Sequence, residues 1–298
     1  MRVLAFDIET VPDLNGLSYR DYQYLRYRGR KDKSEEEVRQ EFSLNPFTLF
    51  VVSVSGTLIE NGEIGEGFVF YVSNLSSKER EKEVFYSEGS SVRVRYTPIR
   101  ADFVEGKLYY LEEEVLKRFW EEVGKVDRLV SFNGYSFDGY VLKVRSMLHG
   151  LDMPESFLRD RSFHVDLMHF LSNGEREKRF RFDFVCRKFG VHSPKDIIDG
   201  SKVAEEFYKG SYETIALYNL KDSLALAQLY TKLRRYIGEE VEEESPTERQ
   251  LNYLIDLITQ VSGLEREIVE RFVGELGEST SRRDMSTIID IFKRIKGL

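Results

Sequence analysis

Two acidic residues interrupt an apolar run near the start of the chain. Residues 3–10 (VLAFDIET) predict a short strand, and because side chains alternate between the faces of a strand, Asp7 and Glu9 point the same way. Adjacent carboxylates in apolar surroundings repel each other and lose hydration. Hard divalent cations such as magnesium prefer carboxylate oxygen and would relieve both costs. We therefore interpret this strand as half of a metal site.

Two later stretches offer the other half. A short buried strand at 129–132 runs into NGYSFD at 133–138 and then into a helix, so Asp138 lies near a helix start, where a negative side chain is favoured. Tyr218 and Asp222 are four residues apart in a long helical pattern and share one face. Taken singly, Asp138 is equally a first-turn acid and the Tyr/Asp pair is equally structural. Their order and spacing together are more specific.

Composition bounds the class of protein. The 298 residues fit one large domain, or one domain and a small appendage, and 41% hydrophobic and 13% aromatic residues suffice for a sizeable core. The net charge of -8 argues against a broad polyanion-binding surface, but it allows a local basic path beside an acidic site. Cys186 is the only cysteine, which suits a reducing cytoplasm, and we expect it in the core. The N-terminus reads as neither signal peptide nor membrane span, so we expect a cytoplasmic protein without a membrane partner.

Several elements must position these acids. The patterns predict a strand at 47–58, its hairpin partner at 67–72 after a turn, and a helix at 112–123. Residues 73–100 read as an irregular insertion or an extra hairpin. We expect the helix after Asp138 to bury Tyr140, Val141, Val144 and Met147.

Two stretches mix basic with aromatic or apolar residues. Residues 19–41 begin with tyrosines between arginines, a combination that suits single-stranded nucleic acid, although buried tyrosines on an amphipathic helix explain it equally. Residues 175–188 are locally basic. A solvated helix face is the usual explanation for such a run, and beside a nucleic-acid site the run could line the approach.

The character of the chain changes after about residue 238. Residues 239–245 are acidic and predict a linker. Ser245, Pro246 and Glu248 read as cap, first position and third position of a helix. Gly263 ends that helix, and a second one ends at Gly274 or Gly277 before a third. We therefore predict a small three-helix module over 246–298.

Three short motifs carry a resemblance to a known family. FDIET at 6–10, NGYSFD at 133–138 and YNLKD at 218–222 resemble the three motifs of the DEDD superfamily of 3'-5' exonucleases. The chain has a tyrosine, not a histidine, four residues before the last aspartate, and in this it resembles the DEDDy branch. The amino-acid sequences of the first two motifs resemble those of the proofreading exonuclease domain of family B DNA polymerases. The resemblance covers roughly residues 1–236, and the C-terminal helices loosely resemble small modules of DNA-processing proteins.

The resemblance implies a fold and a domain plan. The fold is α/β and ribonuclease H-like, with a mixed central sheet and helices on both faces. The expected plan is an exonuclease domain over 1–238 with the insertion at about 73–110, the acidic linker, and the helical module over 246–298.

The resemblance also implies a site. Two divalent cations, Mg²⁺ or Mn²⁺, lie about 4 Å apart in such sites, and Asp7, Glu9, Asp138 and Asp222 would hold them. Tyr218 would hydrogen-bond the attacking water and orient it toward the scissile phosphate. The substrate-binding residues would be Thr10 and Asn133, which would touch the terminal nucleotide, and Phe137, which would shape the pocket. We expect Asp166 to be structural or to support the metal ligands without binding the metal, and none of the four histidines to be a ligand.

The expected activity is hydrolysis of phosphodiester bonds at the 3' end of single-stranded DNA, which releases nucleoside 5'-monophosphates in DNA repair or processing. An exoribonuclease remains an alternative, because the sequence does not show how the pocket treats a 2'-hydroxyl. A catalytically idle nucleic-acid-binding scaffold is a third hypothesis. The C-terminal helices would recruit DNA or a protein partner.

Overall fold

The computed structural model describes ten stretches of the chain: 1–13, 18–27, 34–73, 78–87, 90–100, 108–175, 178–192, 200–238, 246–280 and 282–296. The predicted acidic linker, 239–245, lies outside these residues. The chain forms two compact units, Met1–Ile237 and Gly238–Leu298, and each is described by itself. Among the described residues, no helix has both the length and the apolar character needed to cross a bilayer.

The described elements follow one another along the chain as strands, α-helices and two short 3-10 helices. In order they are β1 Arg2–Pro12, α1 Tyr19–Tyr27, α2 Glu35–Phe42, β2 Leu49–Glu60, β3 Glu63–Ser73, β4 Arg80–Ser87, β5 Ser90–Arg100, α3 Leu108–Val123, β6 Arg128–Ser131, α4 Asp138–His149, α5 Glu155–Arg159, β7 His164–Asp166, α6 Leu167–Leu171, α7 Phe182–Lys188, η1 Gly200–Lys202, α8 Val203–Tyr208, α9 Tyr212–Leu233, η2 Arg234–Tyr236, α10 Glu248–Ser262, α11 Arg266–Ser279 and α12 Arg282–Lys296.

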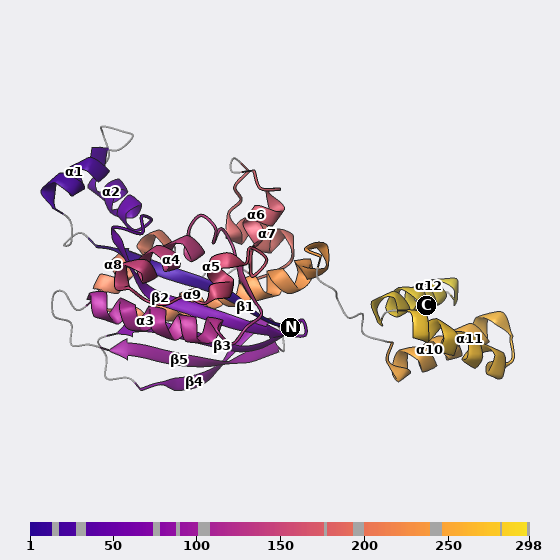
Figure 1. Ribbon diagram of the computed structural model, residues 1–298. Helices are drawn as coiled ribbons and strands as arrows, with labels where there is room; N and C mark the ends of the chain where they lie inside the picture. The colour runs from indigo at the N-terminus through magenta and orange to yellow at the C-terminus, as the bar shows by residue number, and fades with distance from the viewer. Residues whose placement is uncertain are drawn as a thin grey trace. The chain divides into compact units, whose positions relative to one another are not determined.

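One mixed sheet organises the first unit (Figure 1). Across the described residues, its seven strands lie in the order β4-β5-β3-β2-β1-β6-β7. Strands β1, β2 and β3 are antiparallel neighbours, whereas β6 runs parallel to β1 and β7 runs parallel to β6. The first strand of the sequence therefore lies in the interior of the sheet. This mixed sheet with flanking helices confirms the predicted α/β architecture and is consistent with a ribonuclease H-like fold.

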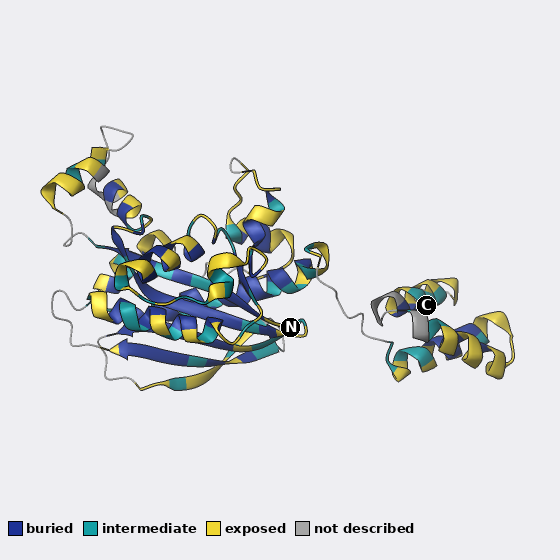
Figure 2. Cartoon of the chain, viewed as in Figure 1, coloured by how far each residue is buried: buried dark blue, intermediate teal, exposed yellow. Residues whose placement is uncertain are grey.

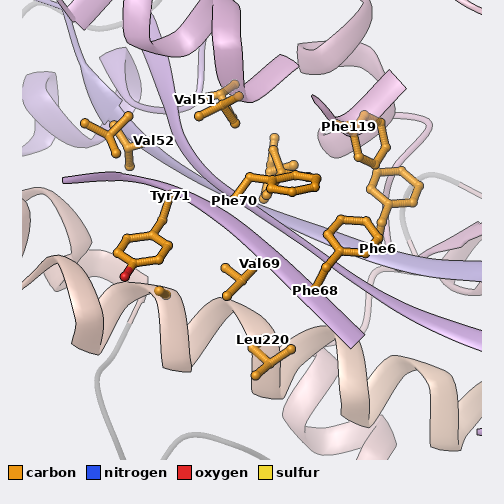
Figure 3. Close-up of a cluster of buried hydrophobic side chains, with 14 of the residues drawn as sticks. Phe6, Val51, Val52, Phe68, Val69, Phe70, Tyr71, Phe119 and Leu220 are labelled. Atoms are coloured by element: carbon orange, nitrogen blue, oxygen red, sulfur yellow. The ribbon is translucent and has the colours of Figure 1, made fainter. Parts of the chain in front are cut away.

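Helices cover both faces of this sheet. Along β3, Val69 and Tyr71 point toward α9, whereas Phe70 points to the opposite side, where Phe119 of α3 lies (Figure 3). Successive side chains of a strand point to opposite faces, so a strand that is covered on both sides reads as a continuous apolar run. The strands accordingly form a buried band through the unit (Figure 2).

The predicted insertion at 73–110 contains an ordered hairpin. Strands β4 and β5 are antiparallel, and β5 adds to the sheet in parallel with β3. Of the two readings of this stretch, the extra hairpin is confirmed and the irregular insertion is wrong for the described part. The alternation of valines and arginines in β5 places Val92 and Val94 in the core.

The prediction for the inward face of α4 was partly wrong. Val141 and Val144 are buried, but Tyr140 is 43% exposed and Met147 is 61% exposed. The helix is amphipathic, and its buried face also includes Leu142 and Arg145, so Tyr140 and Met147 fall on its solvent side.

The second unit consists of α10, α11 and α12 around a small apolar core. The predicted cap of α10 was wrong: Thr247, not Ser245, is the N-cap, and it forms a reciprocal capping box with Gln250. Thr247 takes this place because a side chain three residues on, Gln250, reaches back to its backbone N–H. Gly263 ends α10 in the left-handed conformation, as expected, with φ of 68°.

The predicted end of the second helix of this unit was also wrong. Helix α11 runs through Gly274 and Gly277 to Ser279. A glycine inside a helix costs only about 1 kcal/mol relative to alanine. A Cβ at Gly277 would lie 2.9 Å from the end of the Leu251 side chain of α10, so a larger residue there would make that side chain shift.

A buried ion cluster ties β2, α3 and α4 together. The Glu112 carboxylate, fully buried on α3, accepts hydrogen bonds from the Val51 backbone N–H at 2.8 Å and from Arg145 Nε at 2.8 Å and Nη2 at 2.5 Å. His149 Nε2 lies 2.7 Å from the same carboxylate. Arg145 and His149 both belong to α4, so the cluster fixes the position of the helix that begins with Asp138.

We predict that Glu112→Gln will destabilise the first unit by about 3–5 kcal/mol, because it leaves the buried Arg145 charge without its carboxylate. Scanning calorimetry would measure the loss as a drop in Tm. The matched control is Glu114→Gln on the same helix, whose partner Arg118 is exposed and which should cost at most about 1 kcal/mol. Equal drops in Tm for the two variants would contradict the prediction.

Candidate active site

Asp7 and Glu9 lie where the interior strand β1 leaves its parallel neighbour. Pairing with β6 covers Val3–Ala5 of β1, and the two acids follow directly. The carboxyl ends of parallel strands at a change of strand order form the usual ligand crevice of an open α/β sheet. Pairing with β2 continues past the acids, with a shift in register between Glu9 and Thr10. Both side chains are half-buried.

Helix α9 brings Tyr218 and Asp222 to the same place. A row of alternate hydroxyl residues on β2 fixes its rotation: Ser53 Oγ donates to Asn219 Oδ1 at 2.8 Å and Ser55 Oγ donates to the Asn219 carbonyl at 2.8 Å. Asn219 Nδ2 in turn donates to Asp7 Oδ2 at 2.7 Å. These buried bonds connect the helix to β1 and β2, so its tyrosine and aspartate face the acids of β1.

The loop between β6 and α4 presents Asp138 at the first position of α4. Asp166 at the end of β7 holds this loop, because its carboxylate accepts from the backbone N–H of Asn133 at 2.8 Å and of Tyr135 at 3.0 Å. It also accepts from two backbone N–H groups at the start of α6. Asp166 is therefore a structural residue, as expected.

Two glycines allow the loop to pack this closely. A Cβ at Gly134 would lie 2.0 Å from the Ser131 hydroxyl, and one at Gly139 would lie 2.8 Å from the ring of His164. His164 is itself buried against Ser131, with 2.7 Å between Nε2 and Oγ, and burial lowers its pKa to about 4. The histidine is thus a neutral packing residue under the loop.

The acids share one cavity of about 330 Å³. Carboxylate oxygens of Asp7, Glu9 and Asp222 lie within 4.8 Å of one another, close enough to hold a common ion. Asp138 lines the same cavity but lies outside this group of three. The residues that line the cavity are Asp7, Ile8, Glu9, Phe132, Asn133, Phe137, Asp138, Arg181, Phe182, Asp183, Tyr218, Asp222 and Leu226.

Burial and mutual repulsion disturb these carboxyl groups. Desolvation first, and then the charges of Asp222 and Asp138, raise the pKa of Asp7 and of Glu9 well above its ordinary value. Desolvation also raises the pKa of Asp138 to about 7, although a hydrogen bond from the Ile8 backbone opposes the shift. The protein therefore holds Asp7, Glu9 and Asp138 where their ionised forms are costly.

The donor set fits divalent cations. Among the described residues, no lysine or arginine forms an ion pair with Asp7 or Glu9, and the hydrogen bond to Asp7 comes from a neutral amide. Clustered carboxylates without a compensating side chain match the preference of Mg²⁺ and Mn²⁺ for oxygen ligands. Asp7, Glu9 and Asp222 are the residues placed to hold such ions, and Asp138 is the fourth acid of the cavity wall.

Tyr218 lies beside the acids and keeps its proton. Desolvation and the charges of Asp222, Glu9 and Asp7 raise its pKa above the ordinary value, and it is hydrogen-bonded to Asp222. A phenol in this setting is a hydrogen-bond donor and not a base. It can orient a ligand oxygen without removing a proton from it.

The three predicted substrate contacts have different positions. Asn133 and Phe137 line the cavity. Asn133 adopts the left-handed conformation, with φ of 73°, which asparagine tolerates better than most residues. Thr10 is not among the described residues of the cavity wall, and its hydroxyl donates to the Ser43 carbonyl at 2.7 Å.

Sequence reasoning missed several residues of the site. Asn219, between Tyr218 and Leu220, escaped notice although it contacts Asp7 directly. The available signal was the alternation of Ser53, Ser55 and Thr57 in an otherwise apolar strand, which predicts a buried polar contact on one face. Three further residues of the cavity wall had no sequence signal of their own and only lie close in sequence to stretches that were noticed: Phe132, Phe182 and Asp183.

Comparison with known proteins gives one family. Among curated proteins, no significant match to the chain is found. The family model that matches describes a predicted 3'-5' exonuclease related to the exonuclease domain of PolB, and it covers residues 91–276, more than half of the chain. The matched region contains Asp138, Tyr218 and Asp222, and β1 with its two acids precedes it. The chain therefore belongs to this family of predicted 3'-5' exonucleases related to the exonuclease domain of PolB.

Proposed function

We propose that the protein is a DEDDy-type exonuclease that removes nucleotides from the 3' end of single-stranded DNA with two divalent cations, Mg²⁺ or Mn²⁺. The observation that carries the proposal is the cluster of Asp7, Glu9 and Asp222 oxygens within 4.8 Å, without a compensating cationic side chain on Asp7 or Glu9 in the described chain. Membership of an exonuclease family supports the reaction class.

The residues take distinct roles in this proposal. Asp7, Glu9 and Asp222 hold the cations, and Asp138 completes the acidic wall on the side of α4. When bound, the cations lower the pKa of water and stabilise charge on the leaving 3' oxygen. Tyr218 donates a hydrogen bond that orients the water toward phosphorus. The water oxygen bonds to phosphorus as the bond to the 3' oxygen breaks. The water gives up a proton to solvent, the 3' oxygen takes one up from solvent, and a nucleoside 5'-monophosphate leaves.

The walls of the cavity support an unpaired terminal nucleotide as the substrate. Phe132 and Phe182 lie with their ring centroids 5.0 Å apart, and Phe137 also lines the cavity. Aromatic rings suit the face of a base that is out of the helical stack, and stacking of this kind tolerates any base. A frayed or single-stranded 3' end can supply such a base without the cost of unpairing a duplex.

We predict that the protein will shorten a 5'-labelled single-stranded DNA oligonucleotide from its 3' end in Mg²⁺ or Mn²⁺. EDTA and Asp7→Ala should each abolish the ladder, because each removes the metal centre. Asp152→Asn, which neutralises an exposed acid elsewhere, should leave it intact. A matching RNA substrate reports sugar preference. Binding of both polymers without any ladder would contradict the proposal and favour the scaffold hypothesis.

We predict that Tyr218→Phe will lower kcat by about 10- to 100-fold, because misorientation of a reacting group costs roughly this much. The Mg²⁺ concentration that gives half-maximal rate should not change, because the carboxylates remain. Tyr230→Phe removes a buried hydroxyl from the same helix away from the cavity and serves as the control. A parallel loss of metal affinity in Tyr218→Phe would instead assign the tyrosine to the metal centre itself.

We predict that Asp7→Asn will stabilise the metal-free protein. The pKa of Asp7 is raised in the folded state, so the stability of the metal-free wild type should fall as pH rises from about 4 through neutrality. The amide removes this cost and can still accept from Asn219. The expected gain is roughly 2–4 °C in Tm for each kcal/mol relieved.

The change in Tm on addition of Mn²⁺ completes this test. Mn²⁺ should raise the Tm of the wild type, most strongly at high pH where the carboxylates have lost their protons, and it should do little for Asp7→Asn. If metal-free Asp7→Asn has a lower Tm than the metal-free wild type at pH 8, the charged Asp7 carboxylate does not destabilise the fold, and the prediction is contradicted.

A further inference from the structure

We infer that α7 and the residues just before it form a landing surface for single-stranded DNA, which carries the nucleotides that precede the 3' end away from the cavity. This inference rests on the proposed function, because it names the substrate surface that leads into that site. The surface is defined by Phe180, Arg181, Phe184 and Lys188.

The surface is continuous with the cavity. Arg181 is the N-cap residue of α7, and Arg181 and Phe182 both line the cavity wall. Phe184 follows Arg181 by three residues and Lys188 follows Phe184 by four, so these three side chains lie along one side of the helix. Helix α7 is labelled next to α6 in Figure 1.

The other side of α7 anchors it to the protein. Val185 and Cys186 are buried in the apolar cluster that also contains Leu226 and Leu229 of α9. Helix α9 also carries Tyr218 and Asp222. The surface is therefore fixed to the same helix that builds the candidate site, and it presents its side chains at a constant distance from the acids.

The aromatic side chains of the surface are exposed without covering the core. Phe184 is 44% exposed and Phe180 is 37% exposed. Lys188 Nζ lies 5.5 Å from the centroid of the Phe184 ring, so the ammonium group stands beside an aromatic face. An exposed ring next to a cation matches the two needs of a single strand, a platform for a base and a charge for a phosphate.

The local charge favours a polyanion. Residues 178–188 contain five basic residues and one acid, in a chain whose net charge is -8. The acid, Asp183, is buried and pairs with Arg187 at 3.0 Å and with Arg181 of the surface at 3.4 Å. The cavity itself is lined with carboxylates and repels DNA, so an adjacent basic surface is needed to attract the phosphates. This local excess of positive charge favours DNA as the partner. An acidic or neutral protein surface carries fewer negative charges per unit area and would be attracted less.

Phe184→Ala in the full chain tests the aromatic half of the surface. Fluorescence anisotropy with a labelled 12-residue oligothymidylate in Ca²⁺ should show binding at least about 5-fold weaker, the lower end for loss of one base–aromatic stack. Phe85→Ala is the control, because Phe85 is exposed on β4, the strand farthest from β7 in the sheet. In Mg²⁺, the ratio of kcat/KM for the 12-mer to kcat/KM for a thymidine dinucleotide should fall by a similar factor.

Lys188→Ala tests the cationic half. The slope of log Kd against log salt should become shallower by about 0.7, the value for one phosphate contact to a single strand. Arg93→Ala removes an exposed cation from β5 and should leave the slope unchanged.

Two failures can be told apart. An unchanged Kd in Phe184→Ala together with an unchanged salt slope in Lys188→Ala would overturn the landing surface, whether or not the wild type cleaves DNA. Absence of cleavage of both the dinucleotide and the 12-mer by the wild type would instead overturn the proposed function. An equal loss of 12-mer binding in Phe184→Ala and in its control Phe85→Ala would also count against the surface.

Discussion

The structure is arranged around carboxyl groups that cannot comfortably be charged together. Asp7 and Glu9 belong to a strand in the interior of the sheet, and Asp138 and Asp222 come from helices that are fixed against it. Helix α9 supplies Asp222 and is bonded to β1 and β2, and the loop before Asp138 is held by Asp166 of β7. Burial first, and then their mutual repulsion, raise the pKa values of Asp7, Glu9 and Asp138. The cavity is therefore a place where a multivalent cation is favoured over a single proton.

The donors to Asp7 and Asp138 are neutral groups, and among the described residues no lysine or arginine forms an ion pair with Asp7 or Glu9. Asp7 accepts from the Asn219 amide and Asp138 accepts from the Ile8 backbone. The buried guanidinium of Arg145 is matched to Glu112 of α3, and neither residue lines the cavity in the described chain. A lysine or arginine inside the cluster would neutralise it permanently and would compete with a cation for the same oxygens. Neutral donors fix the geometry and leave the charge of the cluster available.

Much of the fold and of the placement of the acids follows from local rules. The two-residue spacing of Asp7 and Glu9 and the four-residue spacing of Tyr218 and Asp222 are periodicities that a strand and a helix enforce whatever surrounds them. The architecture of a mixed sheet with helices was predicted and is confirmed. The contacts that fix α9 could not be predicted in the same way, because Ser53 and Asn219 are 166 residues apart in sequence. The exposure of Met147 was missed for a related reason. The helical period shows that one face of α4 is buried, but it does not show how much of the helix surface the neighbouring elements cover.

The hydrogen bond between Asn219 and Asp7 spans 212 residues, and it has a consequence for the order of events during synthesis. A chain emerges from the ribosome with its N-terminus first, so the strand with Asp7 and Glu9 is available long before α9. Contacts of such high sequence separation form late and close large loops. The cluster of Asp7, Glu9 and Asp222 therefore cannot be completed until almost the whole first unit has emerged. A nascent chain that has not yet released α9 therefore lacks Tyr218 and Asp222 beside the acids of β1.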